Sequence, residues 1–140
     1  MKYKEYLQSE HWKKVRTKKL KPVGHKMRRC SICGKRWDLQ VHHLQYRNWY
    51  QVKSGDLRRL CSRCHCIAHK LMKEGNLNLG RAKKNSFRFA LTRDAVIKYL
   101  KESGQWVNHF KVQREMKDMF HGKVDKFEEE YQQMVDQEHT

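Results

Sequence analysis

The sequence predicts a small mixed α+β fold that depends on a bound metal. Three observations predict it: two cysteine pairs with metal-ligand spacing, short segments of alternating apolar residues, and helical periodicity elsewhere. The chain has 140 residues, of which 38% are hydrophobic, and its mean hydropathy is −1.05. So polar a chain buries little core, and in such chains a metal often supplies the missing stability.

The apolar residues follow two different periods along the chain. Within residues 3–20 they recur about one helical turn apart, and Ser9 is a candidate cap for a second helix beginning near Glu10. Within residues 37–43, the apolar Leu39 and Val41 alternate with the polar Gln40 and His42, as in a half-buried strand. The expected elements are a helical segment at 3–20, a tight turn at 30–36, strands at 37–43 and 56–60, a helix at 62–73, and a helix that Thr92 caps and that runs to about Ser103.

We expect these elements to form three parts. Residues 1–75 hold the leading helix, both strands and both cysteine pairs, and residues 76–91 form a linker. Residues 92–140 form a helical C-terminal segment. Its apolar residues at helical spacing include Val112, Met116, Phe120, Val124, Phe127, Tyr131 and Met134.

The charge of the chain is large and unevenly spread. Lys and Arg number 32 against 15 Asp and Glu, a net charge of +17. Residues 1–112 carry a net +21 and residues 113–140 a net −4. Such a surplus indicates a polyanionic partner, although a well-solvated surface is the plainer interpretation. The start of the chain has no apolar signal region and no run reaches the ~18 apolar residues of a membrane span, so we expect an intracellular, cytoplasmic protein.

Four of the five cysteines have the spacing of zinc ligands. Cys30 and Cys33 form one C-x-x-C pair, and Cys61 and Cys64 form another. Two such pairs complete the tetrahedral shell of four thiolates that zinc prefers in structural sites. An odd number of cysteines fits a disulfide framework poorly. Cys66 is left over, and we expect it to pack on the core from the 62–73 helix.

Four histidines indicate a second, open metal site. His42 and His43 end the first strand, and His65 and His69 lie four apart on the predicted helix, where both face one side. Because His65 follows Cys64 directly, the cysteine site holds the start of that helix and brings the two histidine pairs together. Three imidazoles leave positions for water and phosphate on a divalent ion, and a fourth histidine suits a general base. Neighbours on a strand face opposite ways, so only one of His42 and His43 shares a face with the helix pair.

These motifs together resemble the HNH endonucleases, nucleases of the ββα-metal (His-Me finger) class. The resemblance covers about residues 3–73, and a leading helix is similar to that of many bacterial and phage members. The residues that carry it are Tyr3-Lys4-Glu5-Tyr6-Leu7, Trp12-Lys13-Lys14-Val15-Arg16, Cys30-x2-Cys33, Val41-His42-His43-Leu44, Asp56-Leu57-x2-Leu60-Cys61-x2-Cys64-His65 and His69.

The resemblance implies a role for each histidine. His42, His65 and His69 match ligands of a catalytic Mg²⁺ or Mn²⁺, and His43 matches the general base. Where the family usually has Asn, nine positions before the first helix histidine, this chain has Asp56. A plain turn or cap residue is the alternative for that position, and Asn48 fits the spacing less well. The implied reaction is hydrolysis of DNA phosphodiesters to 5′-phosphate and 3′-hydroxyl ends, in a bacterial cell and encoded by the cell or a phage.

Lysine and arginine supply most of the non-specific affinity for DNA phosphates. Two alternatives remain: a zinc-stabilised DNA-binding module without cleavage, and an RNA-processing nuclease. We expect no membrane partner, and the acidic segment 113–140 could bind a protein. The candidate DNA contacts are Arg58, Arg59 and Arg63 beside the histidines, Lys13, Lys14, Arg16, Lys18, Lys19 and Lys21 on the first helix, and Arg47, Trp49 and Tyr50 in the loop after His43.

Overall fold

The computed structural model describes residues 2–21, 28–45, 52–120 and 133. Within them the chain forms helices and one small antiparallel sheet, which confirms the α+β class. The elements are α1 (Tyr3–Tyr6), α2 (Glu10–Leu20), β1 (Leu39–His43), the 3-10 turn η2 (Ser54–Asp56), β2 (Leu57–Cys61), α3 (Ser62–Lys73), α4 (Asn85–Glu102) and α5 (His109–Phe120).

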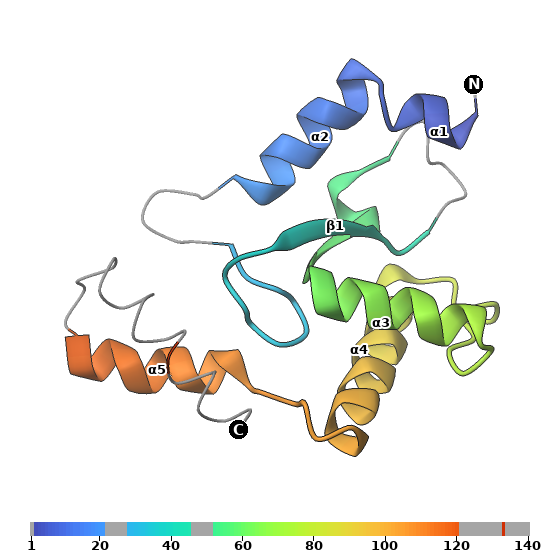
Figure 1. The fold of residues 1–140 in the computed structure, drawn as a ribbon. Coiled ribbons are helices and arrows are strands. Elements are labelled where there is room, and N and C mark those ends of the chain that lie inside the picture. The colour runs from blue at the N-terminus through green and yellow to red at the C-terminus, as the bar shows by residue number, and fades with distance from the viewer. Residues whose placement is uncertain (1, 22–27, 46–51, 121–132, 134–140) are drawn as a thin grey trace.

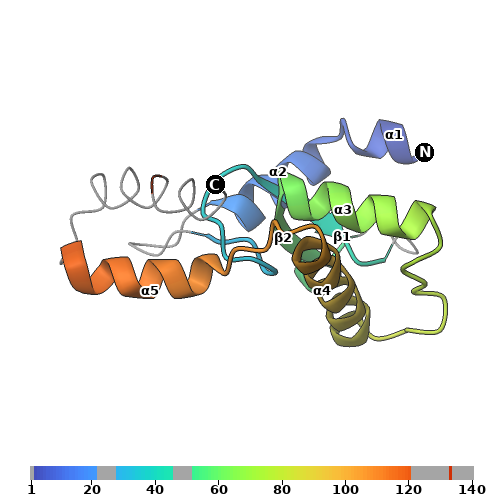
Figure 2. The ribbon, with the colours of Figure 1, turned by 60° about the horizontal axis from the view of Figure 1, so that its bottom comes forward.

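The two strands lie between helices on both sides (Figure 1). β1 pairs with β2 from Leu39 opposite Cys61 to His43 opposite Leu57. α2 lies against one face of β1, and α3 lies against the other face and against β2 (Figures 1 and 2). Since side chains alternate along a strand, each face of β1 presents its own residues to its own helix.

Each face of the sheet has its own hydrophobic core. On the α2 side the core consists of Tyr6, Trp12, Val41, Val52 and Leu57. On the α3 side the larger core joins the cysteines to apolar residues of α3, α4 and the segment between them. Its buried members are Cys30, Ile32, Cys33, Leu60, Cys61, Cys64, Ile67, Ala68, Leu71, Leu77, Leu79, Val96 and Leu100.

Several expected boundaries agree closely with the structure. α3 spans 62–73, and the predicted strands shift only to 39–43 and 57–61. The leading segment is two helices, and Ser9 caps the second, its Oγ accepting a hydrogen bond from the Trp12 amide over 3.2 Å. The loop residues Arg47, Asn48, Trp49 and Tyr50, and most of the C-terminal apolar series, lie outside the described residues.

The expected cap at Thr92 is wrong. α4 begins at Asn85, so the end of the segment expected as a linker is helical, and Thr92 is buried in the helix interior. Its hydroxyl donates to the Arg88 carbonyl oxygen over 2.8 Å. Threonine is common at helix starts, where its side chain accepts a hydrogen bond from a free amide group. Inside a helix its hydroxyl can instead donate to the carbonyl oxygen four residues earlier, so a threonine alone does not mark a helix start.

The expected burial of Cys66 is also wrong, because its side chain is exposed. The buried residues of α3 are Cys64, Ile67, Ala68 and Leu71, which recur at helical spacing along one face. Cys66 falls outside that face.

Candidate metal centres

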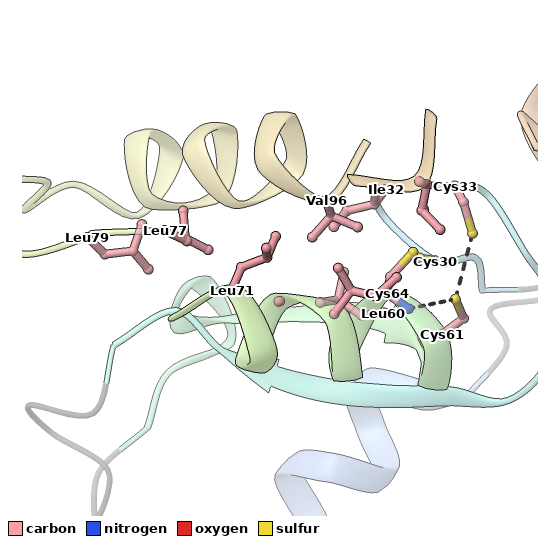
Figure 3. Packing of buried hydrophobic residues seen from close by; sticks show 13 residues of the cluster. Cys30, Ile32, Cys33, Leu60, Cys61, Cys64, Leu71, Leu77, Leu79 and Val96 are labelled. Atoms are coloured by element: carbon pink, nitrogen blue, oxygen red, sulfur yellow. Dashed lines mark hydrogen bonds between the residues drawn. The ribbon is translucent and has the colours of Figure 1, made fainter. Parts of the chain in front are cut away.

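The four predicted zinc ligands come together from three segments of the chain. Cys30 and Cys33 belong to a tight turn, Cys61 ends β2, and Cys64 lies in the first turn of α3. Their sulfur atoms all lie within 4.8 Å of one another, and Figure 3 shows them at one end of the core. All four are buried, free cysteines, so this group could hold a structural metal ion.

The sulfur spacing fits the geometry of tetrahedral zinc. Cys33 Sγ and Cys61 Sγ are 3.7 Å apart. Two thiolates on one tetrahedral zinc, with Zn–S bonds of ~2.3 Å, lie about 3.8 Å apart. Mutual hydrogen bonds lower the pKa of the Cys30 thiol and raise the pKa of the Cys33 and Cys64 thiols, as expected for four sulfur atoms that share protons at close range.

Hydrogen bonds hold the cysteine turn against β2 and orient the Cys61 sulfur at the start of α3. The Ser31 amide donates to the Arg59 carbonyl oxygen over 2.8 Å, and the Cys64 amide donates to Cys61 Sγ over 3.4 Å. The second of these bonds orients the Cys61 sulfur at the start of α3. The first bond therefore joins the turn to β2, and the second joins the end of β2 to α3.

Gly34 closes the turn and allows α5 to approach it. Its φ is +85°, a left-handed conformation that favours glycine. A Cβ added there would lie 2.8 Å from the Phe110 ring and backbone nitrogen. The His109 amide donates to the Cys33 carbonyl oxygen over 2.8 Å, and Gln113 Nε2 donates to the Gly34 carbonyl oxygen over 2.6 Å. These contacts dock α5 on the cysteine turn.

Three of the four histidines form a second candidate centre. His42, on β1, meets His65 and His69 of α3, and the ligand nitrogens of all three lie within 4.8 Å of one another. His65 Nε2 and His69 Nε2 are 3.0 Å apart. Two adjacent ligands on one ion, with bonds of ~2.1 Å, are separated by about 3.0–3.4 Å. The spacing therefore suits a shared metal ion.

His42 is the most constrained member of this group. Its side chain is 1% exposed, and neither ring nitrogen has a hydrogen-bond partner among the described residues. Burial lowers the pKa of His42 to about 3, and burial also lowers the pKa of His65 to about 4. Neutral imidazole is the form that binds metal. A buried, neutral imidazole that faces two others is the strongest indication of a ligand here, because unpaired buried nitrogens are otherwise costly.

Gln40, which the sequence argument did not consider, orients one of these ligands. Its Oε1 lies 2.7 Å from His65 Nδ1. An amide oxygen only accepts, so Nδ1 carries the proton and Nε2 presents its lone pair to the centre. Gln40 precedes His42 by two residues, and this places both side chains on one face of β1. That alternation could have identified Gln40 from the sequence.

His43 lies on the opposite face of β1, away from this group. Its ring stacks on Trp12 at a centroid distance of 4.8 Å and meets Tyr3 edge-on at 5.9 Å. Burial lowers the pKa of His43, and the Asp56 carboxylate opposes that change by raising it. The structure thus resolves the alternative left open by the sequence, since His42 shares a face with the helix pair and His43 does not.

Asp56 fastens the turn that precedes β2. Its Oδ2 accepts a hydrogen bond from the Lys53 amide over 3.2 Å, and its Oδ1 accepts one from Asn85 Nδ2 over 3.0 Å. Asn85 also donates to the Gly55 carbonyl oxygen over 3.0 Å. Asn85, the first residue of α4, thereby fixes the position of η2, which carries the Asp56 carboxylate that raises the pKa of His43. No sequence pattern indicated this contact, because 29 residues separate Asn85 from Asp56.

The arginines and lysines that the sequence predicts to contact DNA differ from one another in their hydrogen bonds and exposure. Arg58 NH1 donates to the Gly55 and Leu57 carbonyl oxygens over 3.0 and 2.8 Å, and Arg63 is exposed at the start of α3. The exposed basic face of α2 forms a shallow, open hollow. Its lining residues are Lys13, Lys14, Thr17, Lys18 and Lys21.

Comparisons with protein-family models, with curated proteins and with solved structures give no match. Among the described residues, no helix is both long and apolar enough to cross a membrane. The chemistry of the two centres therefore carries the functional argument.

Proposed function

We propose that this protein is a metal-dependent DNA endonuclease of the HNH type. The proposal rests on how the four histidines are arranged around β1. Three imidazoles converge on one point while a fourth, adjacent in sequence, faces the other side of the strand. A structural module needs only one closed metal shell, and the four cysteines already supply that shell.

The chain's own residues fit a divalent ion at the histidine group. His42, His65 and His69 would hold it, and desolvation lowers the pKa of each, which favours the neutral imidazole that binds metal. Imidazole nitrogen suits zinc, iron, nickel and copper ions best, and Mn²⁺, a transition ion, accepts it more readily than Mg²⁺, which prefers oxygen. Of magnesium and manganese, the donor set favours manganese. Such an ion stabilises negative charge on a phosphate and on a leaving oxygen.

His43 would act as the general base. It would accept a proton from a water molecule, whose oxygen forms a bond to phosphorus while the bond from phosphorus to the 3′ oxygen breaks. The 3′ oxygen leaves with the electron pair of that bond and takes a proton from solvent water. The products are a 5′-phosphate and a 3′-hydroxyl. A base must begin neutral, and the burial that lowers the pKa of His43 favours that state near neutral pH. Stacking on Trp12 holds the ring in one orientation.

Asp56 would act as a positioning residue for this base. In the proposed family an Asn commonly ties the loop between the strands, and here the Asp56 carboxylate accepts bonds from Lys53 and Asn85 instead. The pair formed by Asp56 and Asn85 offers both an acceptor and a donor, which a single Asn would provide alone.

Two histidine variants test the assignment. His43→Ala should lower the single-turnover rate of plasmid nicking by ~10²–10⁴-fold and leave Mn²⁺ binding intact. His42→Ala should instead weaken Mn²⁺ binding in a calorimetric titration of zinc-loaded protein. If His43→Ala cleaves at the wild-type rate with saturating Mn²⁺, His43 is not the base and the proposed mechanism fails.

The two alternatives are separated by substrate. A zinc-stabilised DNA-binding module would bind duplex DNA without metal-dependent cleavage, and an RNA-processing nuclease would cleave single-stranded RNA in preference to DNA. Plasmid, linear duplex and RNA are each incubated with Mn²⁺, with Mg²⁺ and with EDTA. We expect cleavage of DNA that EDTA abolishes.

A further inference from the structure

Four cations surround β2 and the end of α2, with Arg58 and Arg59 on opposite faces of the strand. They are Lys19, Arg28, Arg58 and Arg59, and we refer to them as the β2 cation cluster. Arg59 NH1 lies 3.4 Å from the Lys19 carbonyl oxygen, and Arg28 Nε donates to the Lys21 carbonyl oxygen over 2.9 Å. Lys19 Nζ donates to both oxygens of Ser54 over 3.1 Å.

Within the part of the chain that the structure describes, no salt bridge joins this cluster to an acidic side chain. The salt bridges among the described residues involve other cations: Lys13, Lys35, Arg93 and Lys98. All four members of the cluster are partly buried. Burial lowers the pKa of Lys19, and the charges of Arg59, Arg58 and Arg28 lower it further. Like charges that lower the pKa of Lys19 in this way repel one another, and a bound anion would offset the repulsion.

Capping of α2 explains only part of the arrangement. Cations near a helix C-terminus are favourable, and Arg28 and Arg59 do bond to carbonyl oxygens of its last residues. A guanidinium has five N–H donors, however, and each of these bonds uses one. Arg59 Nε is buried and has no hydrogen-bond partner among the described residues. That buried atom is out of reach of an external group. Arg58 NH1 bonds to the Gly55 and Leu57 carbonyl oxygens and its guanidinium lies over the Phe89 ring, while Lys19 Nζ bonds to Ser54. Each of these cations keeps further N–H donors for an external acceptor.

We propose that the β2 cation cluster binds a phosphate group of a nucleic-acid strand. The planar guanidinium matches a phosphate in two-pronged geometry, and the ammonium adds a point charge. This inference rests on the proposed function, because the cluster lies one strand away from the histidines. Arg58 is directly opposite His42 in the sheet. A phosphate held here anchors the strand beside the reactive position without taking part in the chemistry.

Binding is tested with the full chain, zinc loaded and in EDTA-free buffer without Mn²⁺, so that no cleavage occurs. A fluorescent 20-base-pair duplex is titrated by anisotropy at several salt concentrations. Lys19→Gln with Arg28→Gln should weaken binding about tenfold at 0.1 M salt and reduce the log–log salt slope by about 1.8. The matched control is Lys98→Gln with Lys101→Gln, which removes the same charge from the exposed face of α4.

The outcomes are distinct. A loss specific to the first double variant supports the cluster, and equal effects from both double variants overturn it. Zinc content and Tm verify folding, and Arg28→Gln alone, whose side chain makes a single bond to Lys21, should give a smaller loss of the same kind. Competition by inorganic phosphate at the same phosphate concentration as the duplex should be far weaker. Equal competition would overturn the assignment to a polynucleotide strand.

Catalysis separates this inference from the proposed function. Hydrolysis of bis(p-nitrophenyl) phosphate, which has one phosphodiester and no neighbouring phosphate, should be unchanged in Lys19→Gln/Arg28→Gln, while KM for DNA rises. Wild-type protein that binds DNA through the cluster but never cleaves would refute the nuclease and retain the cluster. Wild-type cleavage with unaltered DNA binding by the double variant would do the reverse.

Discussion

Gln40 Oε1 accepts a hydrogen bond from His65 Nδ1 over 2.7 Å, and this single contact decides which nitrogen of His65 faces the histidine group. Partners of this kind are usually worth 10–100-fold in metal affinity. The contact spans β1 and α3, so it also couples the strand that carries His42 to the helix that carries the other two ligands.

Gln40→Ala should weaken Mn²⁺ binding by about 10–100-fold because the His65 ring loses its fixed tautomer. The measurement is a calorimetric titration of zinc-loaded protein with Mn²⁺. Gln105→Ala, at an exposed position after α4, is the control and should bind as wild type does. If Gln40→Ala binds Mn²⁺ with wild-type affinity, the hydrogen bond from His65 to Gln40 does not contribute to metal binding.

Removal of one thiolate should unfold the core that the cysteines share with α3 and α4. Metal-binding energy is folding energy in such sites, so Cys61→Ser should lose the zinc and the cooperative thermal transition. Cys66→Ser provides a matched control, since this cysteine is exposed and outside the group. Elemental analysis should find about one zinc per chain in wild type and in the control. Folded wild-type protein without zinc would contradict the prediction.

Asp56 is expected to influence both the loop and the pH dependence of cleavage. Its carboxylate raises the pKa of His43 against the larger lowering by burial. Asp56→Asn removes that charge, so the pKa of His43 falls further, the base is neutral at lower pH, and the midpoint of the pH–rate profile moves downward while cleavage is retained. The measurement is the single-turnover nicking rate from pH 5 to 8 with saturating Mn²⁺.

The loop contribution is read from two further variants in the same assay. Asp56→Ala and Asn85→Ala each remove one side of the bond that joins η2 to α4, so both should lower the rate. Asp94→Ala, which changes an exposed carboxylate of α4, is the control. Wild-type rates in Asp56→Ala at every pH would show that Asp56 is only a turn residue.

Gly34→Ala should destabilise the cysteine turn and the docking of α5. A non-glycine residue in left-handed conformation costs roughly 1–2 kcal/mol, and the added methyl would also meet Phe110 at 2.8 Å. Thermal unfolding should show Tm lower by several degrees. Gly55→Ala is the control, because a Cβ at Gly55 has no neighbour within 4 Å. Equal Tm values for the two variants would contradict the close approach.

Several parts of this protein could be predicted from residue spacing alone. Paired C-x-x-C motifs place two thiolates on one metal whatever the rest of the chain does, and histidines four apart share a helix face. The strands and α3 followed from periodicity, and their bounds were nearly right. The alternation of a strand also predicted that only one of His42 and His43 would meet the helix pair.

The side chains that contact and orient those residues could not be predicted, because they come from distant segments of the chain. Asn85 reaches Asp56 across 29 positions, and Arg59 reaches Lys19 across 40, and neither contact leaves a periodic trace in the sequence. The prediction for Thr92 was wrong because a threonine hydroxyl can bond to a carbonyl oxygen inside a helix as well as to a free amide at a helix start. Contacts between distant segments depend on how whole elements pack, and local propensity does not encode that packing.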